Sequence, residues 1–332
     1  MTSVSILGGG AWGTALAFTC YKAGNITTLW IRDPQQAEKM LLSRENEKYL
    51  AGHVLPSGIA ITHSIEKAIE SHILLLVCPA QNLRSFLESI KNIIPKDAYL
   101  VICSKGIELE TSKLLSEVIA EILPGYCIGV LSGPTFAQDM AEGQPTAATL
   151  ATKEITTARW LASSLSCPTF RLYPSSDVIG VELGGALKNV IAIATGISSA
   201  RNLGESARAS LMTRGLSEIA HLGLAMGAQL ETFMGLSGVG DIVLSCTSPQ
   251  SRNMSFGLKI GRLDRFIPND QNMSILTEGV FTAKAVQNLS ASRDVELPIA
   301  KSIYRIIHQG SPIDEEIKLL LSRPLKTEPF GV

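Results

Sequence analysis

A glycine-rich turn near the start of the chain constrains the fold more than any other feature. An apolar run of strand character, Val4–Leu7, leads directly into Gly8, Gly10 and Gly13, which have G-x-G-x-x-G spacing. The first glycine permits a tight bend, the second lets the backbone approach a pyrophosphate, and the third lets a helix pack against the strand. The helix start then stabilises negative charge. An ordinary glycine turn is the alternative. The flanking strand and helix, and a second strand ending near Asp33, favour a dinucleotide site.

The first half of the chain alternates strand-like apolar runs with helical stretches. Because the runs are apolar almost throughout, we expect strands buried on both faces, as in a parallel sheet between two helix layers. The sequence therefore predicts an α/β fold of Rossmann type with a doubly wound, mostly parallel sheet. The predicted strands are Val4–Leu7, Ile26–Ile31, Ile73–Val77, Tyr99–Cys103, Tyr126–Leu131, Ala147–Ala151 and Thr169–Tyr173.

Four loops follow predicted strands at the edge where such sheets bind ligands, and we expect them to ring one crevice. Glycine and proline can also simply mark the ends of strands. That alternative explains Cys78-Pro79 well, but it explains Lys105, which lies between an apolar strand and a glycine, less well. The four loops are Arg32-Asp33, Cys78-Pro79-Ala80, Ser104-Lys105-Gly106 and Ser132-Gly133-Pro134-Thr135-Phe136-Ala137.

The pattern changes near residue 175, where a turn and a helix cap are expected. Beyond this point the sequence shows no alternating strand pattern, and the apolar residues recur at helical spacing. We therefore expect two domains, a dinucleotide-binding domain over residues 1–176 and an all-helical substrate-binding domain over residues 177–332. The predicted helices are Val178–Ser199, Ser206–Met226, Leu230–Met234, Arg252–Leu263, Thr282–Ser292, Leu297–His308 and Asp314–Ser322.

One predicted helix carries a lysine in apolar surroundings. The segment Val181–Ala194 is apolar on nearly all sides, so it should be buried. Gly184 shares a helix face with Lys188, and Gly185 shares one with Asn189. Because each glycine costs a helix about 1 kcal/mol, the pair indicates that something approaches the backbone closely. A desolvated Lys188 can act as a general base. The alternative is a lysine that reaches solvent at the helix edge.

A polar segment in the second half suits a phosphate group. Asp241 follows a glycine-rich turn and could simply cap the short helix after it. Ser251, Arg252 and Asn253 lie at a predicted helix start, where a guanidinium, a hydroxyl, an amide and backbone N–H groups converge. From this segment alone, a solvated arginine is an equally good interpretation.

Composition excludes several classes of function. Hydrophobic residues make up 45% and charged residues 18% of the 332 residues, which indicates globular domains. The formal net charge is −1 without a Lys/Arg block, so nucleic acid and anionic membranes are not expected partners. The scattered cysteines predict reduced thiols, and the histidines show no metal-ligand spacing. We find neither a signal peptide nor an apolar run of about 20 residues, and expect a cytoplasmic protein.

Taken together and in this order, several motifs resemble the bacterial NAD(P)-dependent glycerol-3-phosphate dehydrogenase family. They extend from residue 6 to about residue 285 and so cover both predicted domains. The matching motifs are Gly8-Gly9-Gly10-Ala11-Trp12-Gly13-Thr14-Ala15, Lys105-Gly106-Ile107, Ser132–Ala137, Glu182–Val190, Thr213-Arg214-Gly215, Gly240-Asp241, Cys246-Thr247-Ser248 through Ser251-Arg252-Asn253, and Thr277-Glu278-Gly279.

The resemblance implies reversible hydride transfer between sn-glycerol 3-phosphate and dihydroxyacetone phosphate, with NAD(H) or NADP(H) as the cofactor. It further implies a role in supplying glycerol phosphate for phospholipid synthesis. Lys188 would be the proton acceptor, with Lys105 and Asp241 completing the polar centre. Substrate would be held by Lys105, Gly133, Thr135, Lys188, Asp241, Ser251, Arg252 and Asn253. The cofactor would lie along Gly8, Gly10, Ala11, Trp12, Gly13, Arg32, Lys105, Ala137, Arg252, Leu276 and Glu278.

The chain departs from the family pattern at two places. Ala11 replaces the serine common in the glycine loop, which removes one possible hydroxyl contact to the cofactor. The segment Gly196–Ser206 stands where the family has a more glycine-rich loop, so its local geometry is open.

Two alternatives and two open points accompany this interpretation. Another two-domain dehydrogenase, acting on a β-hydroxyacid, would also use a helical lysine and asparagine, but the segment from Asp241 to Asn253 favours a phosphorylated triose. A non-catalytic NAD(P)-sensing module predicts loss of Lys105 or Lys188, and both are present. At the second strand, Arg32 favours a 2′-phosphate and hence NADPH with NADH tolerated, whereas the adjacent aspartate favours the bare ribose. The apolar helices of the second half fit a homodimer face or a core equally well.

Overall fold

The computed structural model describes residues 1–267 and 277–325, and the chain forms two compact units. The first unit consists of residues 1–104 and 115–181, and the second of residues 105–114 and the chain from residue 182 onward. The sequence predicts one boundary, between residues 176 and 177. In the structure, residues 105–114 group with the second unit, although they directly follow a strand of the first unit. Each unit is described below by itself.

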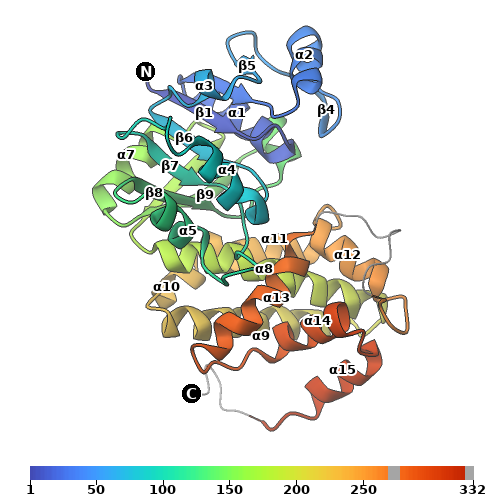
Figure 1. Cartoon of the computed structure of the whole chain (residues 1–332). Helices are drawn as coiled ribbons and strands as arrows, with labels where there is room; N and C mark the ends of the chain where they lie inside the picture. The colour runs from blue at the N-terminus through green and yellow to red at the C-terminus, as the bar shows by residue number, and fades with distance from the viewer. Residues whose placement is uncertain (268–276, 326–332) are drawn as a thin grey trace. The chain divides into compact units, whose positions relative to one another are not determined.

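The first unit contains an eight-stranded sheet in the order β10-β9-β8-β7-β6-β1-β2-β5 (Figure 1). All neighbouring strands pair in parallel except β8 and β9, which are antiparallel. From β5 to β8 this is the strand order of a Rossmann-type sheet, so the predicted fold class is confirmed. The strands are β1 (Ser3–Leu7), β2 (Ile26–Trp30), β5 (Ala60–Thr62), β6 (Ile73–Leu76), β7 (Tyr99–Ile102), β8 (Cys127–Ser132), β9 (Thr146–Thr152) and β10 (Phe170–Ser175).

Helices cover both faces of this sheet because successive strand residues point to opposite sides. In β1, Ile6 packs into the core under α1, α2, α6 and α7, whereas Leu7 packs into the core under α3, α4 and α5. Both residues are fully buried, as the apolar strand pattern predicts. The helices are α1 (Ala11–Lys22), α2 (Pro34–Ser43), α3 (Ile65–Ala68), α4 (Leu83–Ile90), α5 (Leu115–Ile122), α6 (Ala137–Ala141) and α7 (Ile155–Leu165).

All seven predicted strands are present, but the sequence patterns missed three short ones. β5 extends the sheet beyond β2 with only three residues, and β3 (Glu45–Asn46) and β4 (Leu50–Val54) form a separate antiparallel pair. These strands are partly exposed, so they lack the apolar runs by which the buried strands are recognised.

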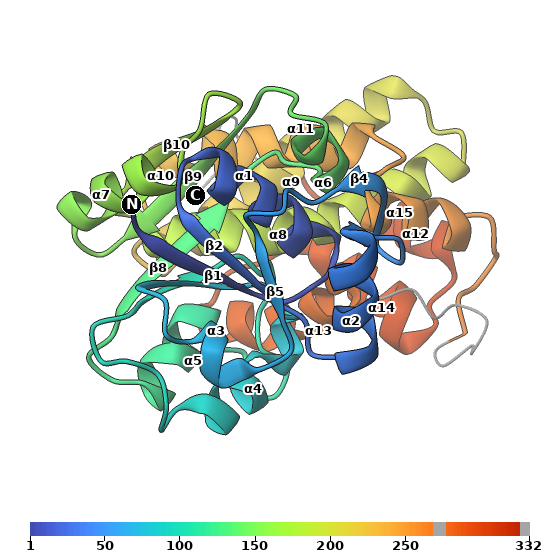
Figure 2. The ribbon, with the colours of Figure 1, turned by 90° about the horizontal axis from the view of Figure 1, so that it is seen from above.

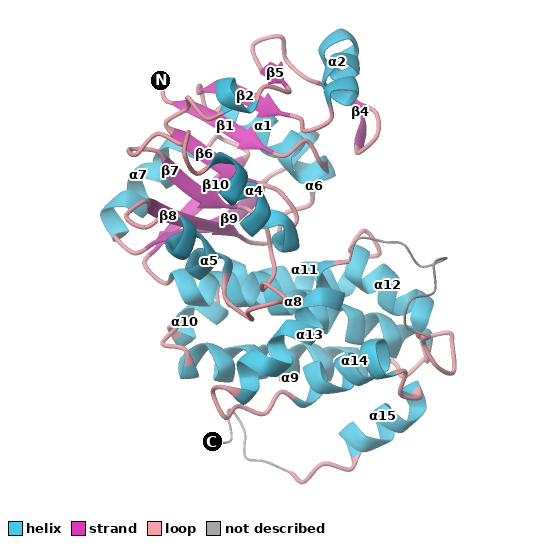
Figure 3. Ribbon diagram, in the orientation of Figure 1, coloured by secondary structure: helices cyan, strands magenta, loops and turns pink. Residues whose placement is uncertain are grey.

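The described part of the second unit from residue 182 onward is helical (Figure 3). Figure 2 shows the helices of this unit from above. The prediction of an all-helical second half is confirmed. The helices are α8 (Val178–Ala200), α9 (Glu205–Ala225), α10 (Leu230–Phe233), a π-helical turn η2 (Leu236–Gly240), α11 (Asp241–Thr247), α12 (Arg252–Ile260), α13 (Glu278–Ala291), α14 (Pro298–Gln309) and α15 (Ile313–Leu321).

Helix α8 corrects the expectation that the segment Gly196–Ser206 forms a loop. With 23 residues it is long and apolar enough to cross a membrane by length and composition, but 83% of its most apolar window is buried inside the protein, as in a core helix. It also continues to Ala200, and α9 begins at Glu205. Only residues 201–204 of the segment Gly196–Ser206 therefore form a connection. Gly196 lies inside α8, where a side chain would meet the Met254 carbonyl oxygen at 2.3 Å.

A buried glutamate of α9 caps the N-terminus of α14. The Glu218 carboxylate accepts hydrogen bonds from the backbone N–H groups of Ile299, at 2.6 Å, and Ala300, at 3.2 Å. These are N–H groups that a helix start leaves without partners in its own helix. Burial raises the pKa of Glu218 from 4.5 to about 8, although both backbone hydrogen bonds and the charges of Arg323 and Arg214 act against the rise.

The raised pKa of Glu218 predicts a pH-dependent stability. The folded state holds this proton more tightly than the unfolded state, so the contribution is fully present below about pH 4.5 and is lost as the pH rises through about 8. We expect the melting temperature of Glu218→Gln, followed by circular dichroism, to fall less steeply over this range than that of the unsubstituted protein. The exposed Glu315 gives the matched control, because Glu315→Gln should leave the slope unchanged. Parallel curves for Glu218→Gln and the unsubstituted protein would contradict the prediction.

Candidate active site

The glycine turn after β1 has the geometry that the sequence spacing predicts. Gly8 has a φ of +146°, a conformation that side chains disfavour, and a Cβ there would lie 2.9 Å from the Val77 carbonyl oxygen. A Cβ on Gly13 would lie 1.8 Å from the Gly8 carbonyl oxygen, so the helix packs directly on the turn. At Gly10, by contrast, a Cβ would meet nothing within 4 Å.

Open space at Gly10 is what a bound pyrophosphate requires. Gly10 is the N-cap of α1, a helix with no acidic residue in its first turn and no side chain that caps it. The first N–H groups of the helix, beginning with Ala11, therefore have no capping side chain. A dinucleotide phosphate fits this end of the helix by charge and by space.

The ends of three neighbouring strands meet beside this turn. Trp12, at the start of α1, donates its indole N–H to the carbonyl oxygen of Cys103, 3.1 Å away at the end of β7. The Ser104 hydroxyl donates to the carbonyl oxygen of Cys78, just after β6. Three of the four predicted loops, those after β2, β6 and β8, lie in the first unit. Lys105, from the loop after β7, belongs to the second unit.

Of the two side chains at residues 32 and 33, one is hydrogen-bonded to the helix after β2. Asp33 is the N-cap of α2, and its Oδ1 accepts from the N–H of Gln35 at 3.0 Å and that of Gln36 at 3.5 Å. The carboxylate is thus used within the protein, whereas the Arg32 side chain is exposed. This arrangement favours the guanidinium as the group that meets an adenosine ribose.

The predicted substrate residues after β8 have structural roles of their own. A Cβ on Gly133 would lie 2.7 Å from the Cα of Ala148 in β9, so strand packing alone requires a glycine here. The Thr135 hydroxyl donates to the Gly133 carbonyl oxygen at 3.4 Å. Ala137 is the first residue of α6 and lies after Phe136, the N-cap.

In the second unit, close packing at one glycine places the predicted catalytic lysine. A Cβ on Gly184 of α8 would lie 2.3 Å from the Ser237 carbonyl oxygen of the π-helical turn η2. The glycine pair predicts that some group lies close to the helix backbone. At Gly184, this group is the backbone of η2. Because η2 runs straight into α11, the contact brings the start of α11 alongside Lys188, one turn further along α8.

Asp241, the first residue of α11, lies between two lysines. Its Oδ1 accepts from the Lys188 ammonium at 2.8 Å, and its Oδ2 accepts from the Lys105 ammonium at 2.5 Å. The side chains of Lys188, Lys105 and Asp241 are 11%, 18% and 1% exposed. The Ser245 hydroxyl, one turn along α11, lies 2.5 Å from the Lys188 ammonium and 3.4 Å from Asp241 Oδ1. Asp241 is thus an ion-pair partner at this helix start, and Gly240 is the N-cap.

Two ammonium groups and one carboxylate give this nearly buried cluster a formal charge of +1. In a site shielded from water, such an excess attracts an anionic substrate and stabilises negative charge that develops on an oxygen. The ammonium of a lysine held in this way can also exchange a proton with a neighbouring hydroxyl or carbonyl oxygen.

A short hairpin-like segment holds Lys105 in the second unit. Fully buried Ile107 bridges to Leu114 in antiparallel fashion, and the N–H of Glu108 donates to the Lys113 carbonyl oxygen at 3.0 Å. The lysine therefore leaves the end of β7 on a segment with fixed backbone contacts.

The predicted phosphate-binding residues lie at the start of α12, as the sequence predicts. Ser251 is the N-cap, and its hydroxyl oxygen accepts from the Met254 N–H at 3.3 Å. The Arg252 side chain is exposed. The Asn253 amide donates to the Asn189 side-chain oxygen at 2.8 Å and accepts from the Gly279 N–H at 3.0 Å.

These contacts join three of the motifs in space. Asn189 follows Lys188 on α8, and Gly279 follows Glu278 in the first turn of α13, so Asn253 links the lysine helix to the start of α13. The structure thus gathers Lys105, Lys188 and Asp241 in one cluster, and it joins Asn253 to Asn189 and to Gly279, the residue after Glu278. Leu276, the remaining predicted cofactor residue, lies outside the described residues.

The sequence analysis did not select two residues that the structure adds. Ser245 contacts the Lys188 ammonium, and its spacing of four from Asp241 on a short helix was the available signal. Asn189 was noticed as a polar interruption, and its contact with Asn253 shows why a buried helix carries it. Neither contact follows from spacing alone, because each joins two helices far apart in the sequence.

Comparisons with known proteins agree with this geometry. Residues 3–158 match the family model described as the N-terminus of NAD-dependent glycerol-3-phosphate dehydrogenase, and residues 177–318 match that of its C-terminus. A curated protein from Parvibaculum lavamentivorans named glycerol-3-phosphate dehydrogenase [NAD(P)+] is 44% identical over 325 residues, which is 98% of each chain. One with the same name from Brucella canis is 45% identical over 328 residues, covering 98% of this chain and 99% of its own.

A solved structure shares the whole fold. The crystal structure of a glycerol-3-phosphate dehydrogenase from Coxiella burnetii superposes with a TM-score of 0.91 at 34% identity, covering 97% of this chain and 99% of that one. Both halves of the sequence and the complete architecture therefore match the same kind of protein. The chain belongs to the NAD-dependent glycerol-3-phosphate dehydrogenase family.

Proposed function

We propose that this protein is an NAD(P)-dependent sn-glycerol-3-phosphate dehydrogenase that interconverts sn-glycerol 3-phosphate and dihydroxyacetone phosphate. The observation that carries the proposal is the buried Asp241 carboxylate with an ammonium group on each oxygen. A protein that only sensed nucleotides would have no use for two nearly buried lysines around one carboxylate. Family membership supplies the substrate class.

The nicotinamide cofactor, when bound, accepts or supplies the hydride. As the neutral amine, Lys188 takes the hydroxyl proton while the C2 alcohol loses its hydride to the oxidised cofactor; as the ammonium, it donates a proton to the carbonyl oxygen in the reverse direction. Asp241 holds Lys188 in place, and Lys105 adds positive charge where negative charge develops on the substrate oxygen. Ser245, which contacts the Lys188 ammonium, acts as a positioning residue.

The phosphate of the substrate accounts for the polar residues at the start of α12. A three-carbon polyol offers little apolar surface, so polar contacts must dominate its binding. The Arg252 guanidinium can donate two parallel hydrogen bonds to phosphate oxygens, while Ser251, Asn253 and the helix N–H groups add neutral donors. Binding of the phosphate orients the reacting carbon, so loss of the phosphate contacts should lower turnover as well as substrate affinity.

The adenosine end of the cofactor fits the first unit. The open space at Gly10 and the uncapped start of α1 suit the pyrophosphate. Because Asp33 is engaged as the cap of α2, exposed Arg32 is placed to bind a 2′-phosphate. We therefore infer that the enzyme prefers NADPH and tolerates NADH.

Supply of glycerol phosphate for phospholipid synthesis and a cytoplasmic location complete the proposal. Six free cysteines support a reducing compartment. A homodimer formed through the helical unit stays a prediction. The formal charge of −1 supports a small-molecule substrate over nucleic acid or an anionic membrane surface.

The phosphate clamp provides a direct assay of the function. Purified protein should consume NADPH, followed by loss of absorbance of the reduced nicotinamide, with dihydroxyacetone phosphate but hardly with unphosphorylated dihydroxyacetone. Arg252→Ala should lower kcat/KM for the phosphorylated substrate roughly ten- to a hundredfold, and Arg252→Lys should also be impaired because it loses the planar fork. Equal losses on both substrates would assign Arg252 to the cofactor or the fold. No NADPH consumption with dihydroxyacetone phosphate would refute the proposed function itself.

The assignment of Lys188 predicts a selective loss of turnover. Lys188→Met keeps the apolar stem and removes the ammonium, so kcat should fall on the order of a hundredfold or more. Nucleotide affinity, measured by fluorescence titration, should change little. The exposed Lys259 of α12 gives a matched control, since Lys259→Met should leave kcat unchanged. Near-normal turnover in folded Lys188→Met would be fatal to the assignment.

Cofactor preference depends on one guanidinium. We expect Arg32→Ala to weaken NADPH binding roughly ten- to a hundredfold, the scale of a charge-assisted hydrogen bond, and to leave NADH binding nearly unchanged. Dissociation constants for both nucleotides should be measured on the same preparation. An unchanged NADPH affinity would remove Arg32 from the site.

A further inference from the structure

A large apolar cavity in the second unit has no part in the proposed reaction. It has a volume of about 720 Å³ and lies among α8, α9, α14 and α15. Its apolar wall includes Ile197, Leu211, Ile303 and Leu320. The volume is within the range of small-molecule binding sites, and the motif residue Arg214, which the active-site cluster does not use, also lines it.

Buried polar atoms in the cavity wall have no partner among the described residues. They are the hydroxyl oxygens of Ser198 and Ser217 and Oε2 of Glu316. The three residues are only 2%, 4% and 3% exposed. Because buried polar atoms are almost always hydrogen-bonded, a wall with several unsatisfied ones fits an occupant that has polar atoms as well as an apolar body.

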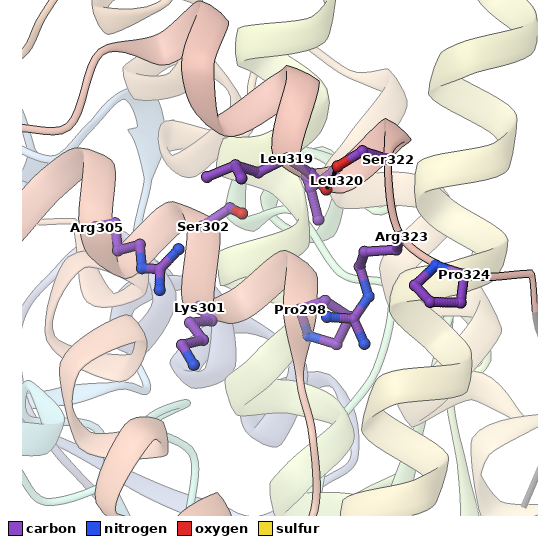
Figure 4. A pocket seen from close by; sticks show the side chains of 9 residues that line it. All are labelled: Pro298, Lys301, Ser302, Arg305, Leu319, Leu320, Ser322, Arg323 and Pro324. Carbon is purple, nitrogen blue, oxygen red and sulfur yellow. Dashed lines mark hydrogen bonds between the residues drawn. The ribbon is translucent and has the colours of Figure 1, made fainter.

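A second, basic hollow adjoins the cavity. It has a volume of about 330 Å³ and shares Ser302, Leu320 and Arg323 with the cavity. Its lining side chains come from α14 and from the chain around the end of α15, and they include Lys301 and Arg305 (Figure 4). Three cationic side chains and no acidic one line this hollow.

The charges around both hollows favour an anion. Arg323 pairs with Glu296 at 2.7 Å, and Arg305 lies 3.8 Å from Glu316. Lys301 forms no ion pair with any described residue. The remaining acid, Glu218, is held by backbone N–H groups of α14, and burial raises its pKa to about 8, so it carries little charge at neutral pH. The three cations of the basic hollow, Lys301, Arg305 and Arg323, therefore face two carboxylates, Glu296 and Glu316.

We propose that this site binds a single-chain amphiphile, with its alkyl chain in the apolar cavity and its anionic head group on Lys301, Arg305 and Arg323. A carboxylate and a phosphate monoester share the required chemistry, because both accept hydrogen bonds from guanidinium and ammonium groups. The alkyl chain takes up the apolar volume, and polar atoms next to the head group can satisfy the serine hydroxyls. This inference is independent of the proposed dehydrogenase activity.

Direct titration of the full-length protein tests the site. Dodecanoate and dodecyl phosphate, each below its micelle concentration, are titrated by calorimetry alongside dodecyltrimethylammonium as the cationic counterpart. We expect the anionic probes to bind at least tenfold more tightly than the cation. Affinity should rise by up to about fourfold for each methylene from octanoate to dodecanoate if the chain is buried. Comparison of the carboxylate with the phosphate identifies the preferred head group.

A charge variant identifies the head-group site. Lys301→Gln combined with Arg305→Gln should weaken binding of both anionic probes at least tenfold, while Lys284→Gln, at an exposed lysine of α13 that lines neither hollow, should have no effect. Circular dichroism and melting temperature establish that the variants are folded, and their unchanged NADPH-dependent turnover separates this test from that of the proposed function.

Three results would overturn the proposal. They are no binding of either anionic probe, equal binding of the cationic probe, and unchanged affinity in the folded double variant. Sedimentation adds a further discriminating outcome. If the double variant changes from dimer to monomer and no amphiphile binds, the surface belongs to a contact with a second copy of the chain.

Discussion

The burial of Asp241 between two ammonium groups is the interaction on which the rest of the helical unit depends. An isolated carboxylate that is 1% exposed would be strongly destabilised, so it requires both lysines and their geometry. Each lysine arrives on a different support. Lys188 comes from the buried helix α8, and Lys105 comes from a segment fixed by the bridge between Ile107 and Leu114. The ion-pair geometry therefore links three separate parts of the chain.

Close backbone packing makes this geometry possible. Gly184 lets α8 approach the carbonyl oxygen of Ser237, and the π-helical turn that carries this serine leads directly into Asp241. π-Helical turns are rare and occur frequently at functional sites. Here the turn sets where α11 starts, and thereby where the carboxylate and the Ser245 hydroxyl meet the Lys188 ammonium. The contact between Gly184 and Ser237 thus sets how α8 packs on the π-helical turn and also where Asp241 and Ser245 meet Lys188.

In the first unit, backbone groups and side chains have separate roles. Its sheet positions the backbone groups of the glycine turn, and no side chain caps the start of α1 there. The side chains that are present mostly hold the protein together. Trp12 ties α1 to the end of β7, and Asp33 caps α2. This leaves the exposed Arg32 as the side chain that we propose distinguishes the two nucleotides.

The sequence by itself determined the fold class and pointed to most residues of the candidate site. Continuous apolar runs located all seven predicted strands, and the helical spacing of apolar residues located the main helices, because buried elements need continuous apolar faces. Glycine spacing located the nucleotide turn, and ordered motifs located Lys105, Lys188 and Asp241. Partly exposed strands such as β5 were missed, since they lack such faces. Only the tertiary structure decided that Asp241 pairs with both lysines, that Ser245 and Asn189 join the network, and that residues 105–114 belong with the helices. Those outcomes depend on contacts between segments far apart in the chain, which local sequence patterns do not encode.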